Sequence, residues 1–231
     1  MKIRSMIYCR NNNTLLKALA LIAVLIIGGY EVAFCAGKNN AKKDANNIET
    51  PKAVDIYELS LEDNLYTPEI ERNGDIISTF QLNQARELKK KGYNVELMRN
   101  GEVIVISILS GQLFAPNDTV LNDLVRLTLK PLLKFLSKAD MYKMILVMHT
   151  DNTGSESYTK NLSQSRVDAV FSWIESCSLA DYVVPYALGA EEPLYPNNSI
   201  ENRKMNRRLE IYLVPGILMI KQAQNGKIDF K

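Results

Sequence analysis

The sequence is poor in cysteine and histidine. Of its three cysteines, Cys9 and Cys35 lie near the amino terminus, so Cys177 has no disulfide partner within the part expected to fold. The single histidine, His149, lacks a second histidine or neighbouring cysteines to complete a ligand set, which favours a structural role. A glycine-rich phosphate loop is also missing. The sequence therefore predicts no metal site and no cofactor.

The sequence also has no excess of basic residues beyond its first segment. It contains 28 lysines and arginines and 26 aspartates and glutamates. Four of the basic residues and one of the acidic residues precede position 36, which leaves 24 against 25 in the remainder. Nucleic-acid-binding domains carry concentrated positive charge that neutralises phosphates. We therefore expect no nucleic acid among the partners.

No apolar run near the amino terminus reaches the ~20 residues that a membrane-spanning helix needs. The run at 18–27 follows four basic residues and precedes two glycines, which is typical of a secretory signal. Residues 1–35 are therefore predicted to be a signal peptide or a membrane anchor. Soluble export, lipidation of Cys35 and an uncleaved anchor are the alternatives, and Phe34 argues against lipidation because such sites favour a small residue there. All three place the folded part outside the cytoplasm.

The remaining chain divides by composition. Residues 36–75 are predicted to be a linker with a partly unassigned end. Residues 37–52 are rich in lysine, asparagine and alanine and cannot bury enough apolar surface to fold. Residues 53–72 show no pattern that predicts a helix or a strand. Helical spacing predicts a helix within 76–94 that leads into the domain. The domain itself is predicted at 95–215, followed by a polar C-terminal tail at 216–231.

Hydrophobic periodicity within the domain predicts one α/β (α+β) fold with helices on one side of a mixed sheet. Asn100-Gly101 between two β-rich runs indicates a hairpin. Pro131 predicts a kink or two short helices in the helical segment around it. The expected elements are strands at 95–98 and 103–108, helical residues at 119–136, a strand at 142–148, a helix at 156–176, a strand at 183–188, a helical turn at 201–206 and a strand at 207–214.

Polar residues gather where the strand at 142–148 turns into the following helix, a common place for a ligand site. Asp151 could cap or close the turn, or it could hold a ligand cation with its second oxygen. Arg166 could lay its stem along the edge of an apolar stripe, or its planar fork could bind a carboxylate. Together the two residues could hold the zwitterionic head of an amino acid. Both are expected at the edge of the fold, so mutation should affect binding more than stability.

The chain contains four separated motifs in a specific order: His149 to Gly154; Tyr158 with Leu162, Ser163 and Arg166; Gly189 to Pro193; and Asn206 to Ile211. These motifs resemble the OmpA-like C-terminal domain family, whose members bind peptidoglycan in the bacterial periplasm. The resemblance covers about Val95 to Val214. It implies a βαβαβ-type domain that binds the diaminopimelate of the peptide stem.

The resemblance also implies a set of site residues. It places Asp151 on the ammonium and Arg166 on the carboxylate of the ligand, and it adds Asn117, Thr150 and Arg208 at matching positions. The function expected from it is non-catalytic binding of peptidoglycan, which tethers an envelope protein or complex to the cell wall. The alternatives are a periplasmic cell-wall hydrolase and a structural partner in an envelope or motor complex with an unused groove. The sequence shows no convincing nucleophile and base, so we expect no enzyme.

Overall fold

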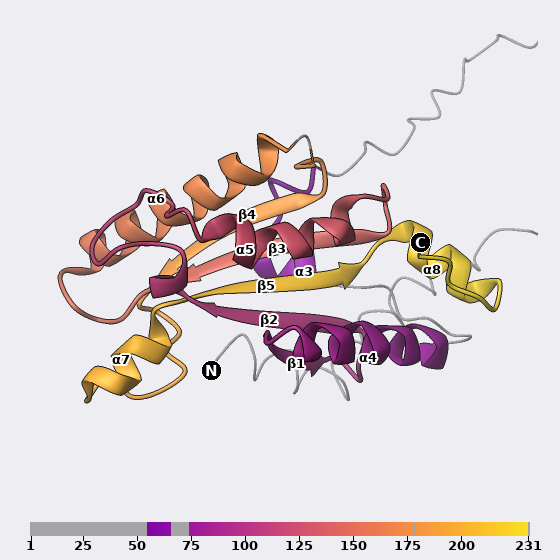
Figure 1. The fold of residues 1–231 in the computed structure, drawn as a ribbon, viewed down its shortest axis with the longest axis horizontal. Helices are drawn as coiled ribbons and strands as arrows, with labels where there is room; N and C mark the ends of the chain where they lie inside the picture. Colours follow the sequence, from indigo (N-terminus) through magenta and orange to yellow (C-terminus); the bar gives the residue numbers. More distant parts are fainter. Residues whose placement is uncertain (1–54, 66–73, 178, 231) are drawn as a thin grey trace, which may run out of the picture.

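A computed structural model of the chain describes residues 55–65, 74–177 and 179–230 (Figure 1). The predicted signal or anchor segment at 1–35 lies outside the described residues, as does the predicted linker up to residue 54. Within the described ranges, no helix combines the length and the apolar character that crossing a membrane requires.

The core of the fold is a five-stranded mixed sheet with the order β1-β2-β5-β3-β4. Its strands are β1 (Asn94–Met98), β2 (Val103–Leu109), β3 (Tyr142–His149), β4 (Val183–Gly189) and β5 (Arg208–Pro215). Neighbours pair antiparallel except β3 and β4, which run parallel. The predicted hairpin forms: Arg99, Asn100 and Gly101 all have positive φ, and the Gly101 N–H donates to the Met98 carbonyl, so Arg99 and Asn100 are the central residues of the turn. The mixed α+β architecture predicted from the sequence is confirmed.

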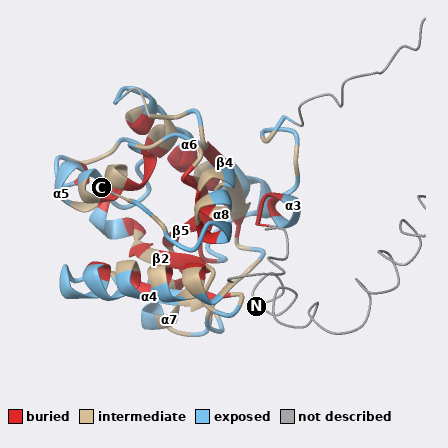
Figure 2. Cartoon of the chain, turned by 90° about the vertical axis from the view of Figure 1, so that its right-hand side faces the viewer, coloured by how far each residue is buried: buried red, intermediate tan, exposed pale blue. Residues whose placement is uncertain are grey.

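Most helices cover one face of this sheet, as Figures 1 and 2 show. The covering helices are α4 (Gly74–Lys90), α5 (Val125–Leu129), the 3₁₀ helix η2 (Lys130–Leu136), α6 (Glu156–Glu175) and α8 (Ile217–Gln224). Two short helices lie next to strand ends: the 3₁₀ helix η1 (Ser110–Gln112) follows β2, and α7 (Ile200–Asn206) precedes β5. Side chains from the covering helices and from alternate positions of the strands form one large apolar core. Pro131 lies at the start of η2, so the predicted helix is indeed divided into two short ones.

The last part of the chain differs from its prediction as a polar tail at 216–231. Residues 217–224 form α8, and Met219 and Ala223 on this helix are buried in the main core. Further on, the ring of Phe230 stacks on Phe135 with the centroids 5.9 Å apart. The tail prediction is therefore wrong for this segment: residues 217–220 are apolar, and Met219 and Ala223, four positions apart on one face of the helix, are buried in the core.

The second face of the sheet is crossed by residues 55–65, which we call the strap. The strap includes the short helix α3 (Leu61–Leu65), which lies behind the sheet in Figure 1. Leu61 and Leu65 pack into a second apolar cluster on this face. Polar contacts fasten the strap at both ends: the Tyr57 hydroxyl donates to the Ala180 carbonyl, and Arg99 Nη1 donates to the Leu65 carbonyl at 2.7 Å. The sequence pattern had left this segment unassigned.

A buried asparagine joins the strap to β3 and β4. Asn64 donates to the Tyr186 hydroxyl at 2.6 Å, and its Oδ1 accepts from Lys143 Nζ at 3.0 Å. Burial lowers the pKa of Lys143 to about 8. A lysine whose pKa is lower in the folded than in the unfolded chain costs stability while it is protonated, and this cost disappears as the pH rises above the folded pKa.

We therefore expect the free energy of unfolding to rise between about pH 8 and pH 10 in the parent protein, from the folded pKa toward the unfolded pKa. The Lys143→Gln variant, which can still donate to Asn64, should lack this rise. Chemical denaturation at a series of pH values measures both, with Lys130→Gln, which removes an exposed lysine, as the control. Equal pH slopes for the parent and Lys143→Gln would contradict the prediction.

Candidate functional site

The loop after β3 is shaped by hydrogen bonds from its own side chains. Asp151 Oδ1 accepts from the backbone N–H of Thr153 at 2.9 Å and closes an Asx-turn. Gly154 follows with φ +105, and a Cβ at this position would lie 2.8 Å from the Tyr158 ring. Ser155 then caps α6 by accepting from the Tyr158 N–H. These contacts fix the position of Asp151 at the end of the sheet.

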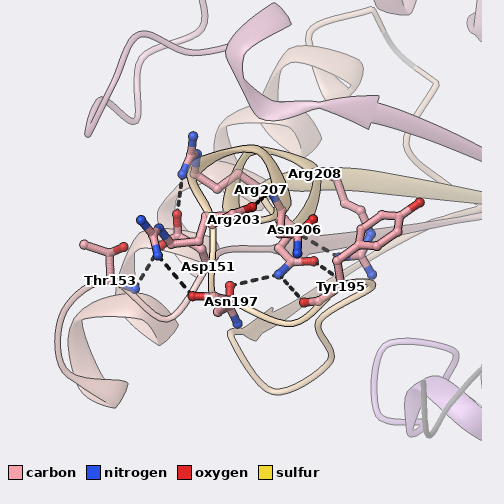
Figure 3. Close-up of polar contacts among 10 residues, drawn as sticks. Asp151, Thr153, Tyr195, Asn197, Arg203, Asn206, Arg207 and Arg208 are labelled. Carbon is pink, nitrogen blue, oxygen red and sulfur yellow. Dashed lines mark hydrogen bonds and ion pairs between the residues drawn. The ribbon is translucent and has the colours of Figure 1, made fainter.

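The second oxygen of Asp151 was expected to be free, and that expectation is wrong. Asp151 Oδ2 accepts from Arg207 Nη1, which comes from the junction of α7 and β5 (Figure 3). Burial alone would raise the pKa of Asp151, but the hydrogen bonds from Thr153 and Arg207 outweigh it and keep the pKa below its ordinary value. Asp151 is therefore an anion with only 5% of its surface exposed.

Arg166 lies on α6 and is oriented by the loop that follows β2. Its Nε donates to the Asp118 carbonyl at 2.8 Å, and Nη2 donates to the Ala115 carbonyl at 3.4 Å. The guanidinium also lies over the Phe114 ring, 5.0 Å from its centroid. Because Nε faces the loop, the two Nη groups form the end of the fork that could meet a ligand carboxylate.

Asp151 and Arg166 are brought to the same end of the sheet. Burial lowers the pKa of Arg166 from its ordinary value, Arg207 adds to the shift, and the Asp151 carboxylate opposes it. Within the described chain no hydrogen bond or ion pair joins Asp151 to Arg166. Both residues are buried, with exposed fractions of 5% and 3%, so the expectation that they lie at the edge of the fold is also wrong.

Asn117 contributes to the site through its backbone. Its φ is +58, a conformation that asparagine tolerates better than most residues, and its side chain is exposed. This turn directs the Ala115 and Asp118 carbonyls toward Arg166. Next to it, Asp118 Oδ1 accepts from the N–H groups of Thr119 and Val120 and stabilises the turn.

Thr150 and Arg208 do not contact Asp151 through their side chains. The Thr150 N–H donates to the Gly189 carbonyl at 2.7 Å, and its buried hydroxyl has no hydrogen-bond partner among the described residues. Arg208 pairs with His149 across β5 and β3, and its Nε donates to Glu210 Oε1 at 2.8 Å. Arg208 therefore belongs to a buried polar cluster on the second face of the sheet, and the neighbouring Arg207 takes the position next to Asp151.

Two further residues hold the loops of the site together. Asn206 is fully buried; it accepts from the Tyr195 N–H and donates to the Tyr195 carbonyl and to Asn197 Oδ1 (Figure 3). Ser163 Oγ accepts from the N–H of Gly189, which ties α6 to the end of β4. Both residues lie in the recognised motifs, but only the fold shows which groups they join.

A separate pocket of ≈ 290 Å³ opens between the first turn of α6 and the end of β4. Its rim carries the exposed ion pair between Lys160 and Glu191, with 2.9 Å between Nζ and Oε1. Neither Asp151 nor Arg166 lines it. We place the candidate site at the Asp151–Arg166 pair, because this pair offers a buried anion and a buried cation to one small ligand.

Comparisons with known proteins were made for the whole chain. No protein-family model matches it. It is 34% identical over 104 residues to the outer-membrane lipoprotein YfiB of Pseudomonas aeruginosa, covering 45% of this chain and 61% of that protein. It is 27% identical over 128 residues to the probable lipoprotein YiaD of Escherichia coli, covering 55% of this chain and 58% of that protein. The chain thus spans about three fifths of the length of these curated relatives.

Among solved structures, the fold is similar to that of a putative MotB-like protein from Desulfovibrio vulgaris. The TM-score is 0.55 at 22% sequence identity, and the match covers 62% of this chain and 98% of the other. At this identity the likeness concerns the fold.

Proposed function

We propose that this chain, which has the OmpA-like fold, binds the peptide stems of peptidoglycan without cleaving them and so tethers an envelope protein to the bacterial cell wall. The observation that carries the proposal is the pair of buried, oppositely charged side chains at one end of the sheet, Asp151 and Arg166. The names of the two relatives, both lipoproteins and one of the outer membrane, support a location in the cell envelope.

The chemistry of the pair matches the free end of diaminopimelate, which carries an ammonium and a carboxylate on one carbon. Asp151 accepts from the ammonium, and the Nη groups of Arg166 donate to the carboxylate in parallel. The charge of Arg166 is fixed in place by two backbone carbonyls and an aromatic ring, so little side-chain entropy is lost on binding. A stem with lysine in place of diaminopimelate lacks this carboxylate and is expected to bind less tightly.

The Asp151→Asn variant distinguishes the role of Asp151 in closing the turn from the role of its negative charge in ligand binding. Asparagine can keep the hydrogen bond from the Thr153 N–H, so the loop should retain its shape and the melting temperature should change little. Loss of a charge-assisted contact of ~1.5–3 kcal/mol should lower the affinity for purified sacculi about tenfold or more. Sedimentation with sacculi measures the affinity, and thermal unfolding measures the fold.

Asp123→Asn is the matched control, because Asp123 is exposed on a neighbouring segment. It should sediment like the parent. Parent-like sedimentation of folded Asp151→Asn would refute the assignment of Asp151. Release of soluble fragments from the sacculi by the parent protein would instead support a hydrolase.

A further inference from the structure

Arg207 occupies the place on Asp151 that a ligand ammonium would take. Asp151 Oδ1 is engaged by the Thr153 N–H inside the turn, so Oδ2 is the oxygen directed to a ligand. Arg207 Nη1 already donates to this atom. The two side chains differ in exposure: 39% of the Arg207 side chain is accessible, against 7% of the Asp151 side chain. An exposed cation therefore covers a buried anion.

We propose that Arg207 is a displaceable competitor that occupies the ammonium subsite and lowers the affinity of the site for every ligand whose ammonium must replace it on Asp151. This inference rests on the proposed function and deepens it. It assigns control of the affinity to Arg207, because a ligand ammonium reaches Asp151 only after Arg207 has left.

The contacts of the two arginines explain why one is fixed and the other can be displaced. Arg166 is 3% exposed and is held by two carbonyls and the Phe114 ring. The side chain of Arg207 has one hydrogen-bond partner in the described part of the chain, Asp151. When Arg207 leaves, its guanidinium is already partly in water, so its release requires little further exposure.

The contacts that a ligand offers determine whether it must displace Arg207 and what it gains in return. A ligand that offers only an amine must displace Arg207 and gains nothing from Arg166, whose positive charge repels it. A ligand that offers only a carboxylate can contact Arg166 but leaves Arg207 in place. A diaminopimelate end replaces Arg207 on Asp151 and binds Arg166 at the same time. The observed affinity is then the intrinsic affinity multiplied by the fraction of molecules in which Asp151 is free.

The test compares Arg207→Gln with the parent and with Arg203→Gln. Arg203 lies one turn earlier on α7 and donates to the Asn197 carbonyl, not to Asp151, so it is a matched control. The probes are two synthetic stem tetrapeptides that are identical except for diaminopimelate or lysine at the third position. Their affinities for the full-length protein are measured by titration calorimetry.

Arg207→Gln should bind the diaminopimelate peptide roughly three- to tenfold more tightly, because Asp151 is no longer blocked. Its affinity for the lysine peptide, whose amine must displace the same residue, should rise by about the same factor, so the ratio of the two affinities should change little. Arg203→Gln should bind both peptides like the parent.

The failure of this inference can be told apart from the failure of the proposed function. If the parent binds the diaminopimelate peptide and Arg207→Gln binds it more weakly, Arg207 is a direct ligand contact and only the inference falls. The inference also falls if Arg203→Gln gives the same gain as Arg207→Gln. If the parent binds neither peptide, the proposed function falls and the inference falls with it.

Discussion

Replacing Arg166 with alanine is expected to lower the affinity for peptidoglycan stems by about tenfold to a hundredfold, because a charge-assisted contact with the ligand carboxylate, ~1.5–3 kcal/mol in total, is lost. The same change should destabilise the domain by about 1–3 kcal/mol, since the side chain is buried and its stem and guanidinium pack on Phe114. Sacculus sedimentation and chemical denaturation measure the two effects separately.

Arg166→Lys distinguishes ligand binding from packing. Lysine keeps the positive charge and most of the apolar stem, so most of the stability should return. It lacks the planar fork, so it cannot hold both the Asp118 carbonyl and a bidentate carboxylate, and binding should remain weak. If Arg166→Lys restores binding in full, the carboxylate is not recognised by the fork.

The largest effect on stability is expected from Asn206→Ala, at about 2–4 kcal/mol. The Asn206 amide bonds to both backbone groups of Tyr195 and to Asn197, and alanine would leave these partners without their hydrogen bonds in a buried place. Thermal or urea unfolding measures the loss.

Asn198→Ala is the control for this change, because Asn198 is exposed in the same loop and, among the described residues, its side chain accepts only from Asn202. It should alter stability by no more than about 0.5 kcal/mol. Similar unfolding midpoints for the Asn206 and Asn198 variants would show that the hydrogen bonds of Asn206 contribute little to the stability of the domain. Arg207 follows Asn206 directly in the chain. A large loss of stability in Asn206→Ala should therefore also disturb the contact between Arg207 and Asp151.

The sequence was sufficient to predict the sheet and the main helices, because their signals are local. The Asn100-Gly101 turn, the break at Pro131 and the apolar strand of β3 each depend on residues within a few positions of one another. The strap and α8 were missed because each gains its stability from distant partners. Asn64 meets Tyr186 from 122 positions away, which no local pattern encodes.

The site was predicted in part for the same reason. Asp151 and Arg166 lie within one strand–turn–helix unit, and both lie at the same end of the sheet, while their role in ligand binding stays a prediction. The choice between Arg207 and Arg208 depends on the register of β5 against β3, in which Arg208 lies opposite His149 and faces the second side of the sheet. A shift by one residue would exchange the two arginines, so only the folded sheet identifies Arg207 as the partner of Asp151.

The strap crosses the second face of the sheet, and several of its contacts lie at the end of the strands opposite Asp151, which matters if the protein carries mechanical load. Lys143 and Ala180, which contact the strap or its asparagine, precede or begin β3 and β4, whereas Asp151 follows the end of β3. With the wall ligand held at one end and the chain before residue 55 pulled at the other, the force runs along the strands. The eight residue pairs between β3 and β5 are then loaded in shear, all at once, and do not open one after another. A sheet loaded this way should resist detachment longer than the same hydrogen bonds would if they were peeled from one edge.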